Sequence, residues 1–503
     1  MKDNSIIIIG AGFAGLSAGI YAQMNGYRAQ IIEMQDSPGG LCTAWKRKGY
    51  TIDGCVHWLA GSSPQSSLYR YWREVGVAQD REFINLDEYL RFEGDDGRTI
   101  IFYTSVDRLK KHLLELSPQD AGPIEEFIQG IRVCLEFDPP VESDPLPKRL
   151  QKGLKVGLLA ATKRKELQGW MKTSAAEFSA RFKDPLLRRA IREMWFPEFS
   201  MFFVLFTFAY LQKRNAGYPI GGSLPMSLAM AKRYINLGGV IQYGNRVEKI
   251  LVQEGTAVGV RLVDGREHRS GRVISAADGH TTIFTMLEGR FADQGTREPY
   301  EKWPTFPPLL FVGVGVNRSF ANEPRTISGI SVPLRRPTEI GEGERDRLLI
   351  HLYNHDPTLA PTGKTTLVVM MPSQYEYWRE LAQDRAAYEE KKDQVARTVV
   401  ELLDQRFPGI SQQVEMVDVA TPLTFEQYTG NWKGSFEGWL ITPQNSSTVL
   451  RSMPQALPGL QNFYMCGQWV APGGGLPTAL LSGRRLVQRL CAEDGKKFHT
   501  STT

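Results

Sequence analysis

The chain has 503 residues, of which 42% are apolar and 23% are charged. At about 150 residues per domain this length predicts about three structural units, and the composition excludes intrinsic disorder, a collagen helix and a simple coiled coil. The net charge of +5 is small for a chain of this length and does not indicate nucleic-acid binding.

Cysteine and hydrophobic patterns indicate the compartment. The five cysteines are scattered without Cys-x-x-Cys spacing, so we expect a reducing environment, with neither a disulfide framework nor a metal site. No signal or transit pattern precedes the first apolar run, which favours a cytoplasmic protein unless a leading segment has been removed. The most apolar window, residues 199–211, is shorter than the roughly 18 to 20 residues of a spanning helix, so no transmembrane helix is predicted.

The first motif is a glycine-rich turn between a strand and a helix. Residues 5–9 are predicted to form a buried strand, and a helical pattern follows G-A-G-F-A-G directly. In this arrangement Gly10 allows a tight turn, Gly12 lets the backbone approach a pyrophosphate, and Gly15 allows close packing of helix and strand. The helix N-terminus adds a positive dipole. The motif therefore predicts an ADP-containing cofactor.

A second strand, predicted at residues 28–33, ends on an acidic residue. Glu33 is placed to accept hydrogen bonds from ribose hydroxyls. NAD and FAD share the ADP half, so both fit the motif up to this point. The turn that follows contains Gly39 and Gly40, where the longer arm of a flavin dinucleotide would pass close to the backbone. This pair favours FAD, and the alternative is an ordinary Pro-Gly turn.

The carboxyl end repeats the same pattern. A short strand at residues 462–466 precedes a glycine-rich turn over 467–475 and a helix predicted at 479–492. Backbone donors at such a helix start would point at electron-rich atoms such as the pyrimidine edge of a flavin. Ser482 and Gly483 give the helix a small face for close packing. The alternative reading is a glycine-rich surface loop.

A basic amphipathic segment spans residues 146–172. It holds eight basic residues and one acidic residue, a net charge of +7. Leucines recur every four residues at 146, 150, 154 and 158, which predicts one apolar helical stripe. Such a segment is attracted to an anionic membrane surface by about 1 kcal/mol per nearby basic side chain. The alternative is a solvated cationic face that packs on the core.

Taken together, these motifs resemble the flavoprotein group that contains bacterial phytoene desaturases, carotenoid isomerases and retinol saturases. The resemblance rests on the two glycine motifs and Glu33, and on five further segments: 37–42, 50–54, 217–223, 273–278 and 356–363. It runs from residue 5 to residue 490, apart from about 106–215. The resemblance implies an α/β fold: a Rossmann-type (glutathione-reductase-like) FAD-binding domain, an inserted mixed-sheet substrate domain and a helical membrane-facing region.

The resemblance also implies how the chain is divided. The FAD-binding domain is expected to be discontinuous and to comprise residues 1–64, 220–299 and 444–503. Residues 65–105 and 300–443 are expected to form the substrate domain, and 106–219 the helical cap.

The cofactor contacts implied by the resemblance lie in the same motifs. They are Gly10, Gly12, Ala14, Gly15, Glu33, Met34, Gly39, Gly40, Leu41, Val247, Gly467, Gln468, Gly475, Leu476, Pro477 and Thr478. Leu41 departs from the family pattern, in which this position is often basic and can reach the phosphates. Arg47 or Lys48 would replace that charge, or backbone donors would suffice.

His57 is the candidate catalytic residue. It belongs to the segment D-G-C-V-H-W-L-A-G (53–61), which resembles the version found in retinol saturases. A histidine with an ordinary pKa near 6.5 can exchange a proton while hydride moves to or from a flavin. The alternative is a structural histidine hydrogen-bonded to the backbone.

The substrate region is expected to be apolar. Aromatic residues crowd the stretch 193–203, and six more are found at Trp303, Phe306, Phe311, Trp378, Phe436 and Trp439. Such density suits a tunnel for a long hydrocarbon.

The predicted function is therefore double-bond reduction, desaturation or isomerisation of a carotenoid or retinoid, with an electron partner that the sequence does not identify. The alternatives are a flavin amine oxidase acting on a polar substrate and a non-catalytic flavin or lipid carrier.

Overall fold

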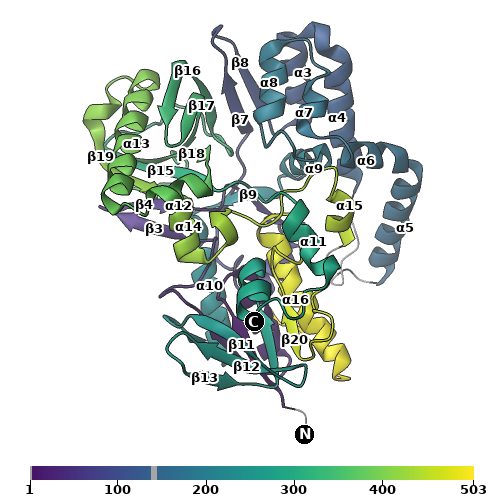
Figure 1. Cartoon of the computed structure of the whole chain (residues 1–503). Helices are drawn as coiled ribbons and strands as arrows, with labels where there is room; N and C mark the ends of the chain where they lie inside the picture. The colour runs from purple at the N-terminus through teal and green to yellow at the C-terminus, as the bar shows by residue number, and fades with distance from the viewer. Residues whose placement is uncertain (1–2, 138–143, 145, 452, 503) are drawn as a thin grey trace.

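The computed structural model describes residues 3–137, 144, 146–451 and 453–502. Figure 1 shows three groups of elements: a parallel sheet with its helices below, a large mixed sheet at the upper left, and a cluster of helices at the upper right. The chain visits the lower group three times, because its strands come from the beginning, the middle and the end of the sequence.

The lower group is built on a five-stranded parallel sheet. Its strand order is β10 (Val240–Gln242), β2 (Arg28–Ile32), β1 (Ser5–Ile9), β14 (Arg272–Ser275) and β20 (Phe463–Met465). The strands predicted at residues 5–9, 28–33 and 462–466 are therefore confirmed. Ile6, Ile7, Ile8 and Ile9 are all buried, as expected of a parallel strand that is covered on both faces.

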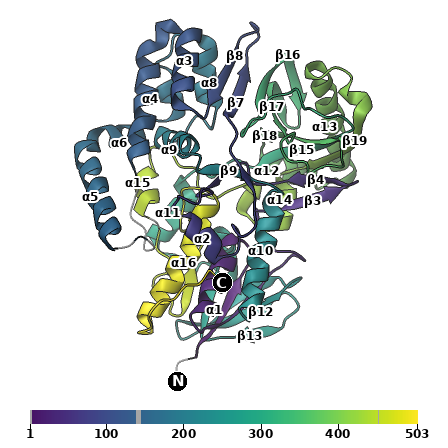
Figure 2. The same cartoon turned by 180° about the vertical axis from the view of Figure 1, so that it is seen from behind.

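Three helices pack beside this sheet: α1 (Phe13–Met24), α10 (Ser223–Asn236) and α16 (Gly475–Glu493). Figure 2 shows α1 and α16 side by side. The two helices approach so closely that a Cβ on Gly483 would lie 2.6 Å from the backbone oxygen of Ala14. The small face predicted at 482–483 is thus the contact face of α16. An antiparallel sheet, β11 (Val247–Gln253), β12 (Thr256–Leu262) and β13 (Glu267–Arg269), completes this group.

The upper-left group is a seven-stranded mixed sheet. Its order is β19 (Val414–Ala420), β15 (Leu309–Val316), β18 (Thr365–Pro372), β17 (Gly343–Leu352), β16 (Ile330–Ile340), β7 (Glu88–Glu93) and β8 (Thr99–Tyr103). Every pairing is antiparallel except that of β16 with β7. Helices α12 (Tyr375–Leu381), α13 (Arg385–Arg406) and α14 (Pro422–Thr429) accompany it.

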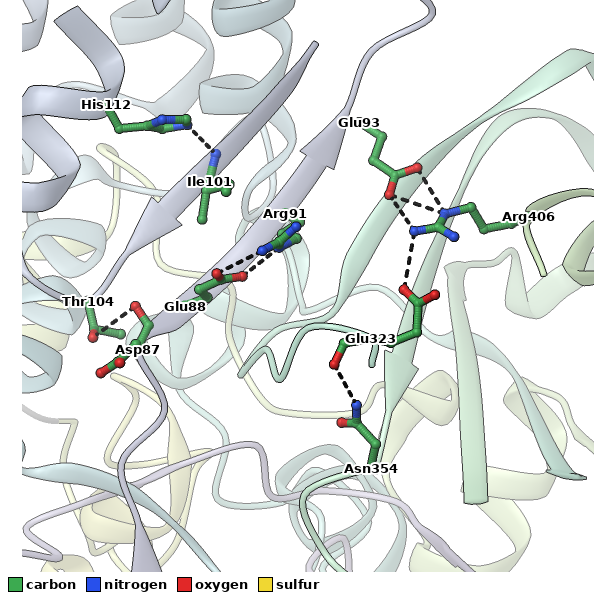
Figure 3. Close-up of polar contacts among 10 residues, drawn as sticks. All are labelled: Asp87, Glu88, Arg91, Glu93, Ile101, Thr104, His112, Glu323, Asn354 and Arg406. Carbon is green, nitrogen blue, oxygen red and sulfur yellow. Dashed lines mark hydrogen bonds and ion pairs between the residues drawn. The ribbon is translucent and has the colours of Figure 1, made fainter. Parts of the chain in front are cut away.

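Ion pairs reinforce the parallel β16–β7 junction. Arg406, at the end of α13, lies 2.9 Å from Glu93 and 3.4 Å from Glu323 (Figure 3). Glu88 and Arg91 form a second pair on β7, 2.6 Å apart. The Arg406–Glu93 pair joins the hairpin of β7 and β8 to a helix that lies more than three hundred residues later.

The upper-right group is helical. It comprises α3 (Val106–Leu116), α4 (Ala121–Glu136), α5 (Leu146–Thr162), α6 (Arg164–Met171), α7 (Ala175–Ser179), α8 (Pro185–Glu193) and α9 (Met201–Gln212). The apolar window predicted from the sequence corresponds to α9, which packs into the core of this group. No helix in the described part of the chain is long and apolar enough to cross a membrane.

Short elements connect the groups. A hairpin of β3 (Ala44–Arg47) and β4 (Tyr50–Asp53) lies against the large sheet, and a small sheet joins β5 (Leu59–Ala60), β9 (Ala216–Pro219) and β6 (Phe83–Ile84). Gly313 and Gly315 of β15 make room for the hairpin, since a Cβ on either would lie within 2.7 Å of Ile52 or Tyr50. The remaining helices are α2 (Tyr69–Glu74), α11 (Gln294–Lys302), α15 (Ser446–Arg451) and a π-helical turn (Thr281–Met286).

Candidate cofactor and active site

The β1–α1 turn has two kinds of glycine. A Cβ on Gly15 would lie 2.0 Å from the oxygen of Gly10, so packing within the protein requires this glycine. Gly12 differs, because its φ of −72° suits any residue and the nearest atom to a Cβ there would be 3.9 Å away. Protein packing does not explain the absence of a side chain at Gly12. The turn therefore fits a ligand that approaches the backbone closely, as a pyrophosphate does.

The second glycine pair adjoins this turn. The amide of Gly39 donates to the oxygen of Ala11 at 2.9 Å, and a Cβ on Gly40 would lie 3.5 Å from the Cα of Gly12. Both glycines have positive φ, +131° and +59°, which favours glycine. The contacting residues of the two motifs are 28 positions apart in sequence, and the motifs thus form one continuous cradle.

The structure does not place a basic side chain from the hairpin on this cradle. Arg47 forms an ion pair with Asp418 at 3.0 Å, and Lys48 donates to the backbone oxygen of Glu415 at 3.2 Å. Both partners belong to β19, so the expectation that Arg47 or Lys48 replaces a charge at Leu41 is not supported. Leu41 itself is partly buried and uncharged, so the expectation that remains is that backbone N–H groups suffice as donors.

Glu33 lies beside the turn between β1 and α1. Its carboxylate accepts hydrogen bonds from the amides of Ala11 at 2.6 Å and Gln35 at 2.9 Å. Burial raises the pKa of Glu33, while these two donors oppose the shift. Each carboxylate oxygen retains acceptor capacity for a ribose hydroxyl. The amide of Asn245 donates to the backbone oxygen of Glu33 at 2.9 Å, which brings the start of β11 at Val247 beside it.

Met34 and Gln468 contact neighbouring loops. The thioether methyl of Met34 lies 3.5 Å from the position of a Cβ on Gly430. The side chain of Gln468 donates to Asn431 at 3.1 Å. Both residues therefore border the loop that connects the large sheet to the carboxyl-terminal motif.

The carboxyl-terminal turn meets the amino-terminal one. A Cβ on Gly467 would lie 3.3 Å from the Cβ of Ala14, and the amide of Gly467 donates to the hydroxyl of Ser482 at 3.0 Å. Helix α16 begins at Gly475, four residues before the predicted start, because Gly474 adopts a φ of +83° and ends the turn there. The first helical turn consequently contains Leu476, Pro477 and Thr478.

A buried aspartate positions the segment that carries His57. Asp53 is 1% exposed and accepts hydrogen bonds from the amides of Cys55, Val56 and Ser223 and from the hydroxyl of Ser223, all between 2.6 and 3.1 Å. These contacts attach the turn after β4 to the N-terminus of α10. Asp53 is therefore a positioning residue, a role that the sequence analysis did not assign to it.

His57 lies against a second histidine from the large sheet. The rings of His57 and His351 stack with centroids 4.4 Å apart at an angle of 30°. Burial, together with nearby His355, lowers the pKa of His57 to about 4 and also lowers that of His351. Within the described residues, neither ring nitrogen of His57 has a hydrogen-bond partner. At neutral pH the histidine is therefore uncharged.

An aromatic cluster extends from this segment. Its members are Trp58, Trp195, Phe196, Phe199, Phe306 and Phe436, with ring centroids 4.9 to 6.1 Å from their neighbours in the cluster. The indole nitrogen of Trp195 is buried and has no partner among the described residues. Of the residues predicted for the substrate region, Phe306, Phe436 and part of the stretch 193–203 thus come together.

The other predicted aromatic residues lie elsewhere. Trp378 packs on Tyr388 in the core between the large sheet and α13, and Phe311 packs between Trp45 and Phe425. Trp303 and Trp439 meet edge to face, with ring centroids 5.7 Å apart, in a separate aromatic group. These four side chains serve packing and do not extend the cluster.

The sequence analysis missed one further residue, Glu437, which adjoins the cluster. The amide of Gly475 donates to its carboxylate, and burial raises its pKa to about 7. A single acidic residue in the aromatic stretch S-F-E-G-W was the signal available in the sequence.

Comparison with known proteins agrees with this geometry. The chain is 25% identical to a phytoene desaturase (neurosporene-forming) of Cereibacter sphaeroides, over 96% of this chain and 93% of that protein. It is also 25% identical to a chloroplastic prolycopene isomerase of Arabidopsis thaliana, over 97% of this chain and 83% of the relative.

Solved structures share the fold. Cyclohexylamine oxidase from Brevibacterium oxydans matches 98% of this chain with a TM-score of 0.61 at 15% identity, and covers 100% of that protein. A putrescine oxidase variant matches 97% of this chain, and 99% of its own, with the same TM-score. The family model described as flavin-containing amine oxidoreductase matches residues 13–491. The chain therefore belongs to the family of flavin-containing amine oxidoreductases, and its cofactor is FAD.

Proposed function

We propose that this FAD-dependent enzyme acts on carbon–carbon bonds of a long apolar isoprenoid such as a carotenoid. The observation that carries the proposal is the aromatic cluster from Trp58 to Phe436, which begins beside His57 and ends beside the N-terminus of α16. The relatives named as a phytoene desaturase and a prolycopene isomerase support the same substrate class. Ligand sites lined by aromatic side chains suit apolar molecules.

The chain's own residues position the substrate and handle protons. FAD supplies hydride exchange when it is bound. The backbone of the glycine cradle would hold the pyrophosphate, and the first turn of α16 would face the flavin ring. His57, neutral and beside the aromatic cluster, is proposed to accept a proton at a ring nitrogen as hydride leaves the substrate, or to return it in the reductive direction.

The test uses the FAD-loaded enzyme with polyenes of different saturation, supplied in lipid vesicles, with oxidised and with reduced flavin. The expected result is a shift in polyene absorption, because the number or geometry of conjugated double bonds changes. Amines are tested in parallel. Flavin reduction by amines without any polyene conversion would contradict the proposal and favour an amine oxidase, and no conversion of either class would favour a carrier.

We also propose that the enzyme docks peripherally on an anionic membrane facing the cytoplasm, through α5. The four leucines of the predicted stripe point away from the protein: Leu146, Leu150, Leu154 and Leu158 are 60%, 60%, 77% and 67% exposed. The alternative of a solvated cationic face that packs on the core is disfavoured, because the apolar stripe of the helix faces solvent. Lys148, Arg149 and Lys155 on the same helix are exposed as well, which complements anionic lipid headgroups.

The position of α5 supports this docking. The helix lies at the edge of the molecule in both views (Figures 1 and 2), and of its side chains Leu159 alone is buried. An isoprenoid that is dissolved in a bilayer would then reach the protein at the helical group, to which the aromatic residues of the 193–203 stretch also belong.

A further inference from the structure

Glu437 occupies the point where the aromatic cluster meets the cofactor cradle. It follows Phe436, whose ring lies 5.2 Å from that of Phe306. Its carboxylate reaches α16, where it accepts a hydrogen bond from the amide of Gly475 and would lie 3.1 Å from a Cβ on Gly474. The backbone oxygen of Glu437 accepts from the side chain of Asn431 at 3.0 Å, which fixes the loop.

The surroundings of Glu437 do not stabilise a negative charge beyond this one amide. In the part of the chain that the structure describes, no cationic side chain contacts the carboxylate. Lys433, on the same loop, turns to Glu376 at 3.5 Å. The titratable group that faces Glu437 from the turn after β4 is the thiol of Cys55. A hydrogen bond with the thiol of Cys42, and then burial, raise the pKa of Cys55, so it stays neutral.

The Gly475 amide, which donates a hydrogen bond to Glu437, is also expected to donate one to the flavin ring. Backbone N–H groups at the start of α16 are the donors for the carbonyl oxygens of the pyrimidine edge. One N–H group cannot serve the carboxylate and the cofactor equally well. We propose that Glu437 is a proton-binding group of the flavin site, which releases the Gly475 amide to FAD and takes up one proton when the cofactor binds.

The direction of the effect follows from the loss of this donor. In the protein without cofactor the carboxyl has a pKa of about 7, and the Gly475 hydrogen bond opposes a further rise. When FAD binds, the carboxylate of Glu437 loses that hydrogen bond and the flavin ring excludes water from it. Both changes disfavour the ionised form and raise the pKa of Glu437 further. At pH 8 the free carboxyl is mostly ionised and the bound one is protonated, so uptake approaches about one proton per FAD. Above pH 7 the affinity for FAD falls, by at most about tenfold per pH unit.

The proposal is tested by titration calorimetry of FAD into cofactor-depleted protein at pH 8, in two buffers with different ionisation enthalpies. The wild type is expected to take up close to one proton. Glu437→Gln is expected to bind FAD without uptake and with an affinity that does not change between pH 7 and 9. Glu426→Gln, a carboxyl-to-amide change at a residue that pairs with Tyr375, should behave as the wild type.

Two results would overturn the proposal: no proton uptake by the wild type, or undiminished uptake by Glu437→Gln. The wild-type measurement is decisive even if the variant fails to fold. The readout involves FAD and no other ligand, so it remains valid if the isoprenoid substrate class proves wrong.

Discussion

His57 and His351 stack face to face with 4.4 Å between ring centroids, although His57 follows the hairpin of β3 and β4 and His351 lies near the end of β17 in the large sheet. The pair thus joins the cofactor-binding part of the molecule to the large sheet. Burial lowers the pKa of both rings, and the neighbouring His57 adds to the shift at His351, so both histidines stay neutral at physiological pH. The contact with His351 is compatible with His57 as a proton acceptor, and it argues against a permanently charged side chain at position 57.

The first prediction concerns catalysis by His57. His57→Phe keeps an aromatic ring against His351 but removes both nitrogens, so turnover of the polyene should fall about 100-fold or more. FAD loading, measured by flavin absorbance, should not change. His112→Gln is the control, since this histidine accepts a hydrogen bond from the amide of Ile101 (Figure 3). Wild-type turnover by His57→Phe would assign His57 a structural role.

The second prediction concerns stability in acid. The folded protein lowers the pKa of His57 and of His355 to about 4, and lowers that of His351. In the unfolded chain these groups titrate near 6.5. The unfolded state therefore binds more protons between pH 6.5 and 4, and the free energy of unfolding falls as the pH falls through this range.

The measurement is the melting temperature at pH 7.0 and pH 5.0. His351→Phe should show a smaller decrease between the two values than the wild type, whatever its stability at pH 7.0. An equal decrease in both proteins would mean that His351 does not contribute to acid sensitivity.

The third prediction separates the roles of two glycines in the first motif. Gly12→Ala places a methyl group in space that the protein itself does not use, so the protein should fold normally yet bind FAD at least about tenfold more weakly, a loss of about 1.4 kcal/mol. Gly122→Ala is a matched control on α4, where a Cβ also meets no neighbour. Normal FAD affinity in Gly12→Ala would show that the pyrophosphate does not approach this position.

Local signals predicted the parallel strands and glycine turns well. A buried isoleucine run followed by a glycine-rich turn specifies β1 and α1 without reference to distant residues. The start of α16 was predicted four residues late because the positive φ of Gly474 is a property of the folded turn. The segment 146–172 was expected to form one basic amphipathic stretch, whereas the structure divides it at Lys163 into α5 and α6.

Long-range packing decided what the sequence did not reveal. The parallel pairing of β16 with β7 joins residues about 240 positions apart, and no local pattern specifies such a partner. The same is true of the site: His351 and Glu437 reach it from the large sheet and from a late loop. Aromatic composition predicted an apolar region but did not separate Phe306, which joins the cluster, from Trp378, which fills the core.

The last prediction tests α5 as the membrane contact. Replacing Leu150 and Leu154 with glutamine removes two exposed apolar side chains and leaves the charge of the helix unchanged. Burial of a leucine contributes about 1.5 to 3 kcal/mol, so partial insertion of both predicts at least about tenfold weaker sedimentation with vesicles of phosphatidylcholine and phosphatidylserine. Val263→Gln, at a 63% exposed position in the turn after β12, controls for the loss of an exposed apolar residue elsewhere. Because electrostatic attraction is screened by salt, binding of the wild type should also weaken as ionic strength rises. Equal sedimentation of the double variant and the wild type would exclude the leucine stripe as the contact, and equal FAD loading of the two proteins would show that both are folded.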